Sequence, residues 1–172
     1  MRNPESSVIQ LKGYYPGVVG KVTELHAVYY HENWGFDVSF ETQVAVEFSE
    51  FIIQYQEGRD GFWASTTGEK FSGCIAIDGR GTHTEGARLR WYIVVPRFQG
   101  LGIGRRLLRE AIEFCRRAAY RRIYLWTFEG LNAARHLYER ERFRLSEEHA
   151  VSQWGRDITE QMFELNLWQS RT

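Results

Sequence analysis

Cysteine and proline are scarce in this sequence, and no apolar run is long enough to span a membrane. The 172 residues include three prolines and two cysteines, Cys74 and Cys115. Neither cysteine belongs to a CxxC pair, which argues against a disulfide framework and predicts two buried free thiols. The longest apolar-rich run, residues 44–55, is interrupted by two glutamates, and no apolar signal core opens the chain. We therefore predict one soluble, cytoplasmic domain over residues 1–172.

An overall excess of either charge is also lacking. The formal net charge is zero, which gives no support to a nucleic-acid partner. Locally, residues 1–60 hold nine acids against four bases, whereas residues 97–122 hold eight arginines against two glutamates. Solvated helix faces are one explanation of this asymmetry. The other is an anionic ligand over the arginines and a cationic ligand near the acids.

Two familiar nucleotide-binding motifs are missing from the glycine-rich segment 94–108, VVPRFQGLGIGRRLL. A G-x-G-x-x-G fingerprint starting at Gly100 or Gly102 would need its last glycine at Arg105 or Leu107. A P-loop needs a lysine, and the segment has none. A β-like run that enters glycines and then a helix near Ile103 nevertheless predicts a phosphate site, because free amides and the helix dipole favour an anion there.

Metal-binding motifs are missing as well. His31-Glu32 begins like the zinc helix H-E-x-x-H, but Gly35 stands where the second histidine would be. The other histidines have no ligand spacing, and we interpret them as surface or internally hydrogen-bonded groups. The sequence therefore predicts no metal site.

Hydrophobic periodicity predicts the element order β-α-α-β-β-β-α-β-α-β-β. A strand–helix–strand unit over residues 87–128 requires a parallel pair, and the hairpins around it imply a mixed α/β sheet covered by helices. Strands are expected over 8–15, 62–66, 69–78, 87–95, 121–128, 143–151 and 160–168, and helices over 18–35, 39–55, 103–115 and 131–138.

The glycine spacing itself matches a known signature. Gln99-x-x-Gly102-x-Gly104 fits the Q/R-x-x-G-x-G/A pattern, and it follows a strand that ends in VVP. About thirty residues later comes LNAARHLYERERF, which contains an LYE tyrosine. In these features the chain resembles the Gcn5-related N-acetyltransferases. Its general sequence pattern also resembles that of the acetyltransferase halves fused to MarR-type regulators. The resemblance implies a GNAT-like fold and a single N-acetyltransferase domain.

The resemblance also implies acetyl-CoA as cosubstrate, lying between the strands that end at Val95 and Phe128. Main-chain groups of Val94 and Val95 would pair with the pantetheine arm, and the Val94 region would polarise the thioester carbonyl. Arg105 is the arginine expected to contact phosphate, with Arg97 and Arg106 nearby. The pyrophosphate would lie on the backbone of residues Gln99, Gly100, Leu101, Gly102, Ile103, Gly104 and Arg105.

Tyr138 corresponds to the catalytic tyrosine of the family. Its implied role is to protonate the departing CoA thiolate or to hold a water near the sulfur. The family often places an asparagine seven residues before this tyrosine, where this chain has Leu131. Asn132 is the next residue, and whether it contacts CoA instead is left open.

The acceptor side is less well defined. In the family it is built from the first two helices and the last hairpin, which here hold Glu32, Trp34 and Trp154. An aromatic and acidic pocket would suit a primary amine of a small molecule or peptide. The tryptophans could equally pack in the core or on a homodimer surface.

The strand 87–95 carries no acid that could act as the general base of the reaction. Glu24, His31, Glu32 and His83 are the candidates elsewhere, with no ground to choose among them. We interpret the chain as an acetyl-CoA-dependent N-acetyltransferase in which the amine attacks the thioester directly. The main alternative is an acyl-CoA-binding sensor without turnover, and a nucleic-acid-binding module rests only on the arginine-rich helix.

Overall fold

A computed structural model describes residues 8–81 and 86–168 of the chain. Its described strands form one mixed sheet in the order β1-β2-β3-β4-β5-β7-β6, in which β4 and β5 pair in parallel and every other neighbouring pair is antiparallel. The strands are β1 (Ile9–Lys12), β2 (Gly61–Thr67), β3 (Lys70–Asp78), β4 (Ala87–Val94), β5 (Arg122–Phe128), β6 (Arg144–Gln153) and β7 (Arg156–Asn166).

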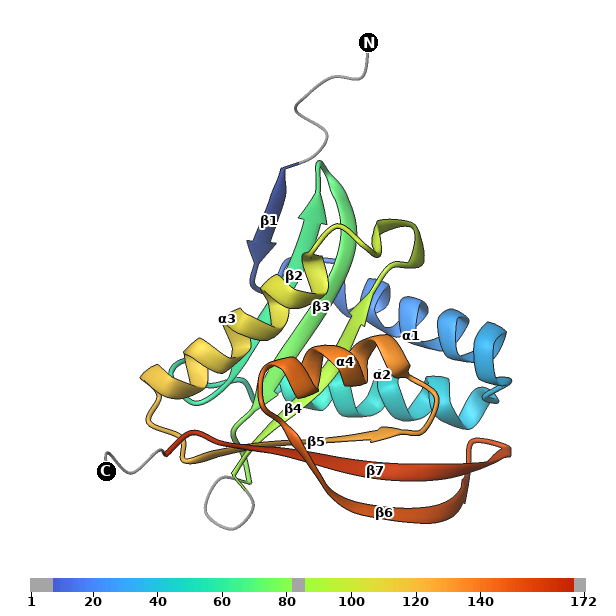
Figure 1. Ribbon diagram of the computed structural model, residues 1–172. Helices are drawn as coiled ribbons and strands as arrows, with labels where there is room; N and C mark the ends of the chain where they lie inside the picture. Colours follow the sequence, from blue (N-terminus) through green and yellow to red (C-terminus); the bar gives the residue numbers. More distant parts are fainter. Residues whose placement is uncertain (1–7, 82–85, 169–172) are drawn as a thin grey trace.

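Helices cover both faces of the sheet (Figure 1). The helices α1 (Val18–Trp34) and α2 (Val38–Ile53) lie on one face, and α3 (Ile103–Arg117) and α4 (Asn132–Arg140) lie on the other. Gly35 ends α1 in the left-handed conformation, and the Asp37 carboxylate starts α2 by accepting a hydrogen bond from Ser39 N at 3.0 Å. This tight junction holds α1 and α2 side by side.

Each face of the sheet has its own apolar core. Buried aliphatic side chains from β3, β4, β5 and α3 fill the core under α3 and α4, and the buried rings of Tyr138 and Phe163 belong to it. The core under α1 and α2 is mostly aromatic and includes Phe36, Phe48 and Phe128. Both cores cover β4, so this strand is buried on two sides and its alternate residues belong to different cores.

Strand β4 is bulged at its centre and separates from β5 beyond that point. The register with β3 shifts between Cys74 and Ala76, and Trp91 at the bulge has a positive φ of 48°. The pairing of β4 with β5 covers only Ala87 and Arg88. The two strands diverge toward their carboxyl ends (Figure 1), which opens the centre of the sheet.

The predicted fold class and element order are confirmed, with one correction at the last hairpin. We expected the last two strands over 143–151 and 160–168, but β6 and β7 continue to a tight turn at Trp154-Gly155. Trp154 and Gly155 both have positive φ there, which is the geometry of a two-residue hairpin turn. Cys74 and Cys115 are buried free thiols, as predicted. Among the described residues, no helix is long and apolar enough to cross a membrane.

Candidate active site

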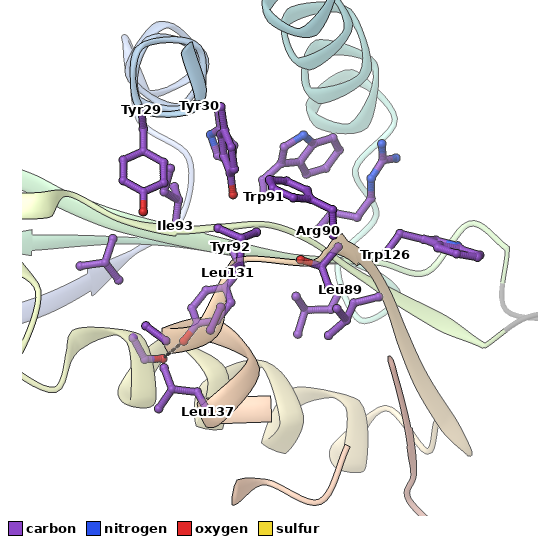
Figure 2. A pocket seen from close by; sticks show the side chains of 18 of the residues that line it. Tyr29, Tyr30, Leu89, Arg90, Trp91, Tyr92, Ile93, Trp126, Leu131 and Leu137 are labelled. Atoms are coloured by element: carbon purple, nitrogen blue, oxygen red, sulfur yellow. Dashed lines mark hydrogen bonds between the residues drawn. The ribbon is translucent and has the colours of Figure 1, made fainter. Parts of the chain in front are cut away.

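One cavity of about 750 Å³ occupies the gap between β4 and β5 and opens to both faces of the sheet. From the α3 and α4 side it is lined by the glycine loop and the first turn of each helix. From the α1 and α2 side it is lined by aromatic and charged side chains. Figure 2 shows Tyr29, Tyr30 and Trp91 on the second side of β4 and Tyr92 and Leu137 on the first. The cavity is large enough for a bound small molecule to reach across the sheet.

The glycine loop presents free backbone donors to this cavity. Gly102 is the N-cap of α3 with φ of 81°, and no side chain caps the helix. The first N–H groups of α3 therefore have no intrahelical acceptor and point toward the loop, where the helix dipole also favours an anion. A Cβ on Gly104 would lie 3.0 Å from Tyr92 Oη and 3.3 Å from Leu137 Cδ1. This close approach explains why glycine is present there.

Val94 and Val95 differ in how their backbone groups are used. The N–H of Val95 donates to Ser72 O at 2.9 Å, and its carbonyl accepts from Phe98 N at 2.8 Å. Both groups are therefore satisfied, and Val95 is absent from the cavity lining, so the expected pantetheine contact of Val95 is not supported. Val94 belongs to the alternate position of the ladder, and its N–H and C=O face the gap toward β5.

Some of the remaining predicted loop residues line the cavity and others do not. Gln99 lines the cavity and its Nε2 donates to Val94 O at 3.3 Å, which ties the loop to the end of β4. Leu101 is 57% exposed and lies outside the lining, so its side chain has no place in the predicted site. Cavity-lining residues from the predicted set are Val94, Gln99, Gly100, Gly102, Ile103, Gly104, Arg105, Asn132, Tyr138, Trp34 and Trp154.

The three loop arginines differ in their placement relative to the cavity between β4 and β5. Arg105 lines the cavity beside Gly102 and Gly104. Arg106 instead donates from Nη1 to Ile9 O at 2.6 Å, and Arg97 stacks on Phe98 with 4.8 Å between Cζ and the ring centroid. This arrangement favours Arg105 as the phosphate contact.

Tyr138 is buried on α4 and lies against Tyr92, with ring centroids 5.9 Å apart. Burial raises its pKa well above the ordinary value, so the hydroxyl keeps its proton. The neighbouring Tyr92 hydroxyl donates to Gly104 O at 2.6 Å, as the dashed line in Figure 2 shows. Tyr92 thus fixes α3 against β4, a role that the sequence analysis did not assign.

The predicted acceptor residues are separated by the fold. Trp34 and Trp154 line the cavity, but each also packs in the aromatic core. Trp34 lies 5.3 Å from Phe128 between ring centroids, and the Trp154 indole N–H donates to Gln43 Oε1 at 2.8 Å. Glu32 is exposed and absent from the cavity lining, so the expected acidic contact from this residue is not supported.

The general bases expected on α1 are likewise outside the cavity. Glu24, His31 and Glu32 do not line it, and His31 Nδ1 is held by Phe36 O at 2.9 Å. His83 lies outside the described residues. Glu24, His31 and Glu32 lie on the exposed surface of α1. Helix periodicity alone could not predict this, because it does not show which face of the helix packs on the sheet.

Charged residues that were not predicted from the sequence line the acceptor side of the cavity. Glu47 of α2 and Glu160 of β7 are the cavity-lining carboxylates within residues 8–81 and 86–168. Glu47 is ion-paired with Arg90, and Glu160 lies 3.0 Å from His149 Nε2. Arg88 and Arg90 of β4 also line the cavity. Their alternation along ARLR was the only signal in the sequence, and it indicated a strand rather than a site.

His26 is a further titratable group of the cavity wall. It is buried on α1, and its Nδ1 is 2.8 Å from Val22 O, so this nitrogen carries the proton and donates it. Burial lowers its pKa to about 4, against the opposing effect of the hydrogen bond. The neutral ring is therefore part of the wall at neutral pH. No group of three or more metal-ligating side chains occurs within the described parts of the chain.

Comparison with known proteins identifies the family to which these features belong. The sequence profile described as the acetyltransferase (GNAT) family matches residues 17–142. The chain belongs to this family. Membership confirms the prediction of an N-acetyltransferase fold and enzyme class. The resemblance to MarR-fused acetyltransferase halves, the roles of individual site residues and the single-domain boundaries stay predictions. No curated relative matches the sequence.

Solved structures of low sequence identity share the fold. A GNAT-family acetyltransferase from Staphylococcus aureus superposes with a TM-score of 0.74 at 18% identity, covering 94% of this chain and all of its own. The yncA protein of Salmonella typhimurium, described with its cofactor acetyl-CoA, gives 0.65 at 14% identity over 95% and 96% of the two chains. An acetyltransferase from the same organism that modifies the N-terminal serine of ribosomal protein L7/L12 gives 0.68 at 17% identity over 95% and 98%.

Proposed function

We propose that the protein transfers the acetyl group of acetyl-CoA to a primary amine of a small molecule or peptide. The observation that carries this proposal is the cavity that crosses the sheet between β4 and β5. It joins a phosphate-binding loop on one face to an aromatic and charged wall on the other. A thioester entering from α3 and an amine entering from α1 and α2 would meet inside it. The two Salmonella structures, with acetyl-CoA and with an N-terminal amine as target, support the same pair of substrates.

The residues of the α3 side fit acetyl-CoA. The uncapped N-terminus of α3 and Arg105 supply donors and positive charge for the pyrophosphate. The N–H and C=O of Val94 face the gap and would pair with the pantetheine arm as an added strand. Asn132 begins α4 on the cavity wall, where a contact with the pantetheine arm is accessible.

Direct attack by the amine is supported by the state of the two cysteines. Burial raises the pKa of Cys115 to about 12 and raises that of Cys74 further. Neither thiol ionises at neutral pH, and neither lines the cavity, so an acetyl-cysteine intermediate has no support. The amine lone pair would attack the thioester carbon, and the C–S bond would break with its electrons moving to sulfur.

Tyr138 would then act on the departing thiolate. Because burial raises its pKa far above that of a thiol, complete proton transfer to sulfur is unfavourable. A hydrogen bond from the hydroxyl to the thiolate, or to a water that protonates it, is the role that this environment favours. The substrate ammonium must lose one proton before its nitrogen can attack, and this proton would go to water or to Glu47 or Glu160, carboxylates of the opposite wall. The second proton, released from nitrogen as the amide forms, would reach the thiolate through water.

The test is an acetyl-CoA titration followed by a thiol-release assay with polyamines, aminoglycosides, amino acids and peptides. Micromolar binding and turnover of at least one amine are expected. Binding without turnover on any amine would instead support the acyl-CoA sensor. The absence of any acetyl-CoA binding would overturn the assignment of the cavity.

A further inference from the structure

Two arginines of β4, on the N-terminal side of its bulge, line the acceptor side of the cavity. Arg88 and Arg90 lie on the face of β4 that is covered by α2. Arg88 pairs in register with Tyr124 of the neighbouring strand β5. Arg90 is fully partnered. Its guanidinium pairs with Glu47 and with Asp78 at 3.3 Å, and it stacks on Trp91 with 4.1 Å from Cζ to the ring centroid.

Arg88 is different because its guanidinium has no partner. Within residues 8–81 and 86–168 it makes no hydrogen bond and no ion pair, and its Nε is buried without an acceptor. Burial lowers the pKa of Arg88 and the charge of Arg90 lowers it further, yet a guanidinium stays protonated at neutral pH. The side chain of Arg88 is partly exposed, but its Nε is buried without an acceptor, and a ligand that supplies this acceptor would restore the missing hydrogen bond.

Among the described residues, no carboxylate of the surrounding wall forms an ion pair with Arg88, although Glu47 and Asp78 are near enough to favour its charge. Glu47 is committed to Arg90, and Glu160 is next to His149. The indole of Trp126, two residues beyond Tyr124 on the same face of β5, forms an apolar wall of the cavity near Arg90 (Figure 2). An anion on an otherwise apolar or aromatic molecule would therefore satisfy the site, whereas a polycation would be repelled by Arg88.

We propose that the acceptor carries a carboxylate as well as its amine, and that Arg88 binds this carboxylate. The inference rests on the proposed function, because it assigns the substrate class of the same cavity. Arg88 lies on the N-terminal side of the β4 bulge, whereas the glycine loop follows the C-terminal end of the strand. The acceptor would therefore extend from the thioester toward Arg88. A guanidinium offers two parallel donors to a carboxylate, which fixes the orientation of the amine. Amino acids and other amino-carboxylates are the predicted acceptors, in place of the cationic acceptor suggested by the acidic first sixty residues.

The experiment compares amines that differ only in the carboxylate. Suitable pairs are phenylalanine and phenethylamine, tryptophan and tryptamine, and 6-aminohexanoate and hexylamine. For at least one pair, kcat/KM of the wild-type protein should favour the carboxylated member about 10-fold or more. The Arg88→Met variant should lose this preference through a higher KM for the carboxylated member, Arg88→Lys should recover part of it, and kcat/KM for the carboxylate-free amine should not decrease.

Two controls separate the possible failures. Arg144→Met removes an exposed arginine of β6 outside the cavity and should leave both members of each pair unaffected. Calorimetric binding of the same carboxylates to CoA-saturated protein tests Arg88 without turnover, and Arg88→Met should weaken it about 10-fold. Amine turnover with no effect of the carboxylate, or equal carboxylate binding by wild type and Arg88→Met, would overturn this inference. Acetyl-CoA binding without turnover on any amine would overturn the proposed function, while the calorimetry still decides the role of Arg88.

Discussion

The two sides of β4 are built in different ways. On the α3 side, the residues that would hold the cosubstrate come from one continuous segment, Val94 to Arg105, with Tyr138 and Asn132 added from α4. On the α1 side, the cavity wall is assembled from α1, α2, β4, β5, β7 and the last hairpin turn. The first side is held together by backbone geometry, and the second by side-chain packing and ion pairs.

This difference explains which substrate each side can recognise. A run of backbone amides at a helix N-terminus recognises a pyrophosphate whatever side chains surround it, so the same loop serves many proteins that use one cosubstrate. A wall of separate side chains can change one residue at a time without loss of the fold. The α1 side is therefore the part that adapts to a particular acceptor.

The largest effect is expected from a charge placed in the backbone cradle of the α3 side. Gly102→Glu adds a carboxylate at the N-terminus of α3, where like-charge repulsion would oppose the pyrophosphate. We expect acetyl-CoA affinity, measured by calorimetry, to fall about 100-fold or more. Gly17→Glu is the matched control, because Gly17 is also a left-handed N-cap with open space around it, but on α1. Equal losses in the two variants would mean that backbone strain, not the cradle, controls binding.

A buried histidine makes the α1 side sensitive to acid. The pKa of His26 is about 4 when folded against an ordinary 6.5, so the unfolded chain binds a proton first as the pH falls. The free energy of unfolding should decrease from pH 6.5 to 4, by about 3 kcal/mol in total from this residue. Urea unfolding across this range should show a shallower pH slope for His26→Asn, whose amide can still donate to Val22 O. His136→Asn, which changes an exposed residue of α4, should keep the wild-type slope.

Substitution of Tyr138 should lower turnover without weakening cosubstrate binding. Tyr138→Phe keeps the ring against Tyr92 but removes the hydroxyl that would stabilise the leaving thiolate. We expect kcat to fall about 100-fold while the Kd of acetyl-CoA stays within about 2-fold of wild type. Single-turnover rates and calorimetry measure the two quantities. Tyr14→Phe, at an exposed tyrosine, is the control. A large loss of affinity with intact kcat would assign Tyr138 to binding instead.

The same contrast between the two sides explains how much could be predicted from the sequence. The element order, the glycine loop and Tyr138 follow from local patterns, because spacing along one segment determines them. Glu32 was misplaced because helix periodicity does not say which polar residues border a cavity. Arg88, Arg90 and Glu47 were missed because only the packing of α2 on β4 brings them to one cavity wall, where Glu47 pairs with Arg90. Contacts between distant segments of this kind leave no spacing signal.

The smallest effect is expected from removing one tyrosine hydroxyl on each side of β4. Tyr92→Phe removes the hydrogen bond to Gly104 O that joins β4 to α3. The expected cost is about 1 kcal/mol of unfolding free energy, equivalent to a Tm lower by about 2–4 °C. Tyr30→Phe, on the α1 side, removes a hydroxyl for which no hydrogen bond is found within the described residues, and should change stability by less than about 0.5 kcal/mol. Thermal unfolding of both variants measures the difference. An equal or larger cost at Tyr30 would show that hydrogen bonds of its hydroxyl, and not aromatic packing alone, stabilise the acceptor side.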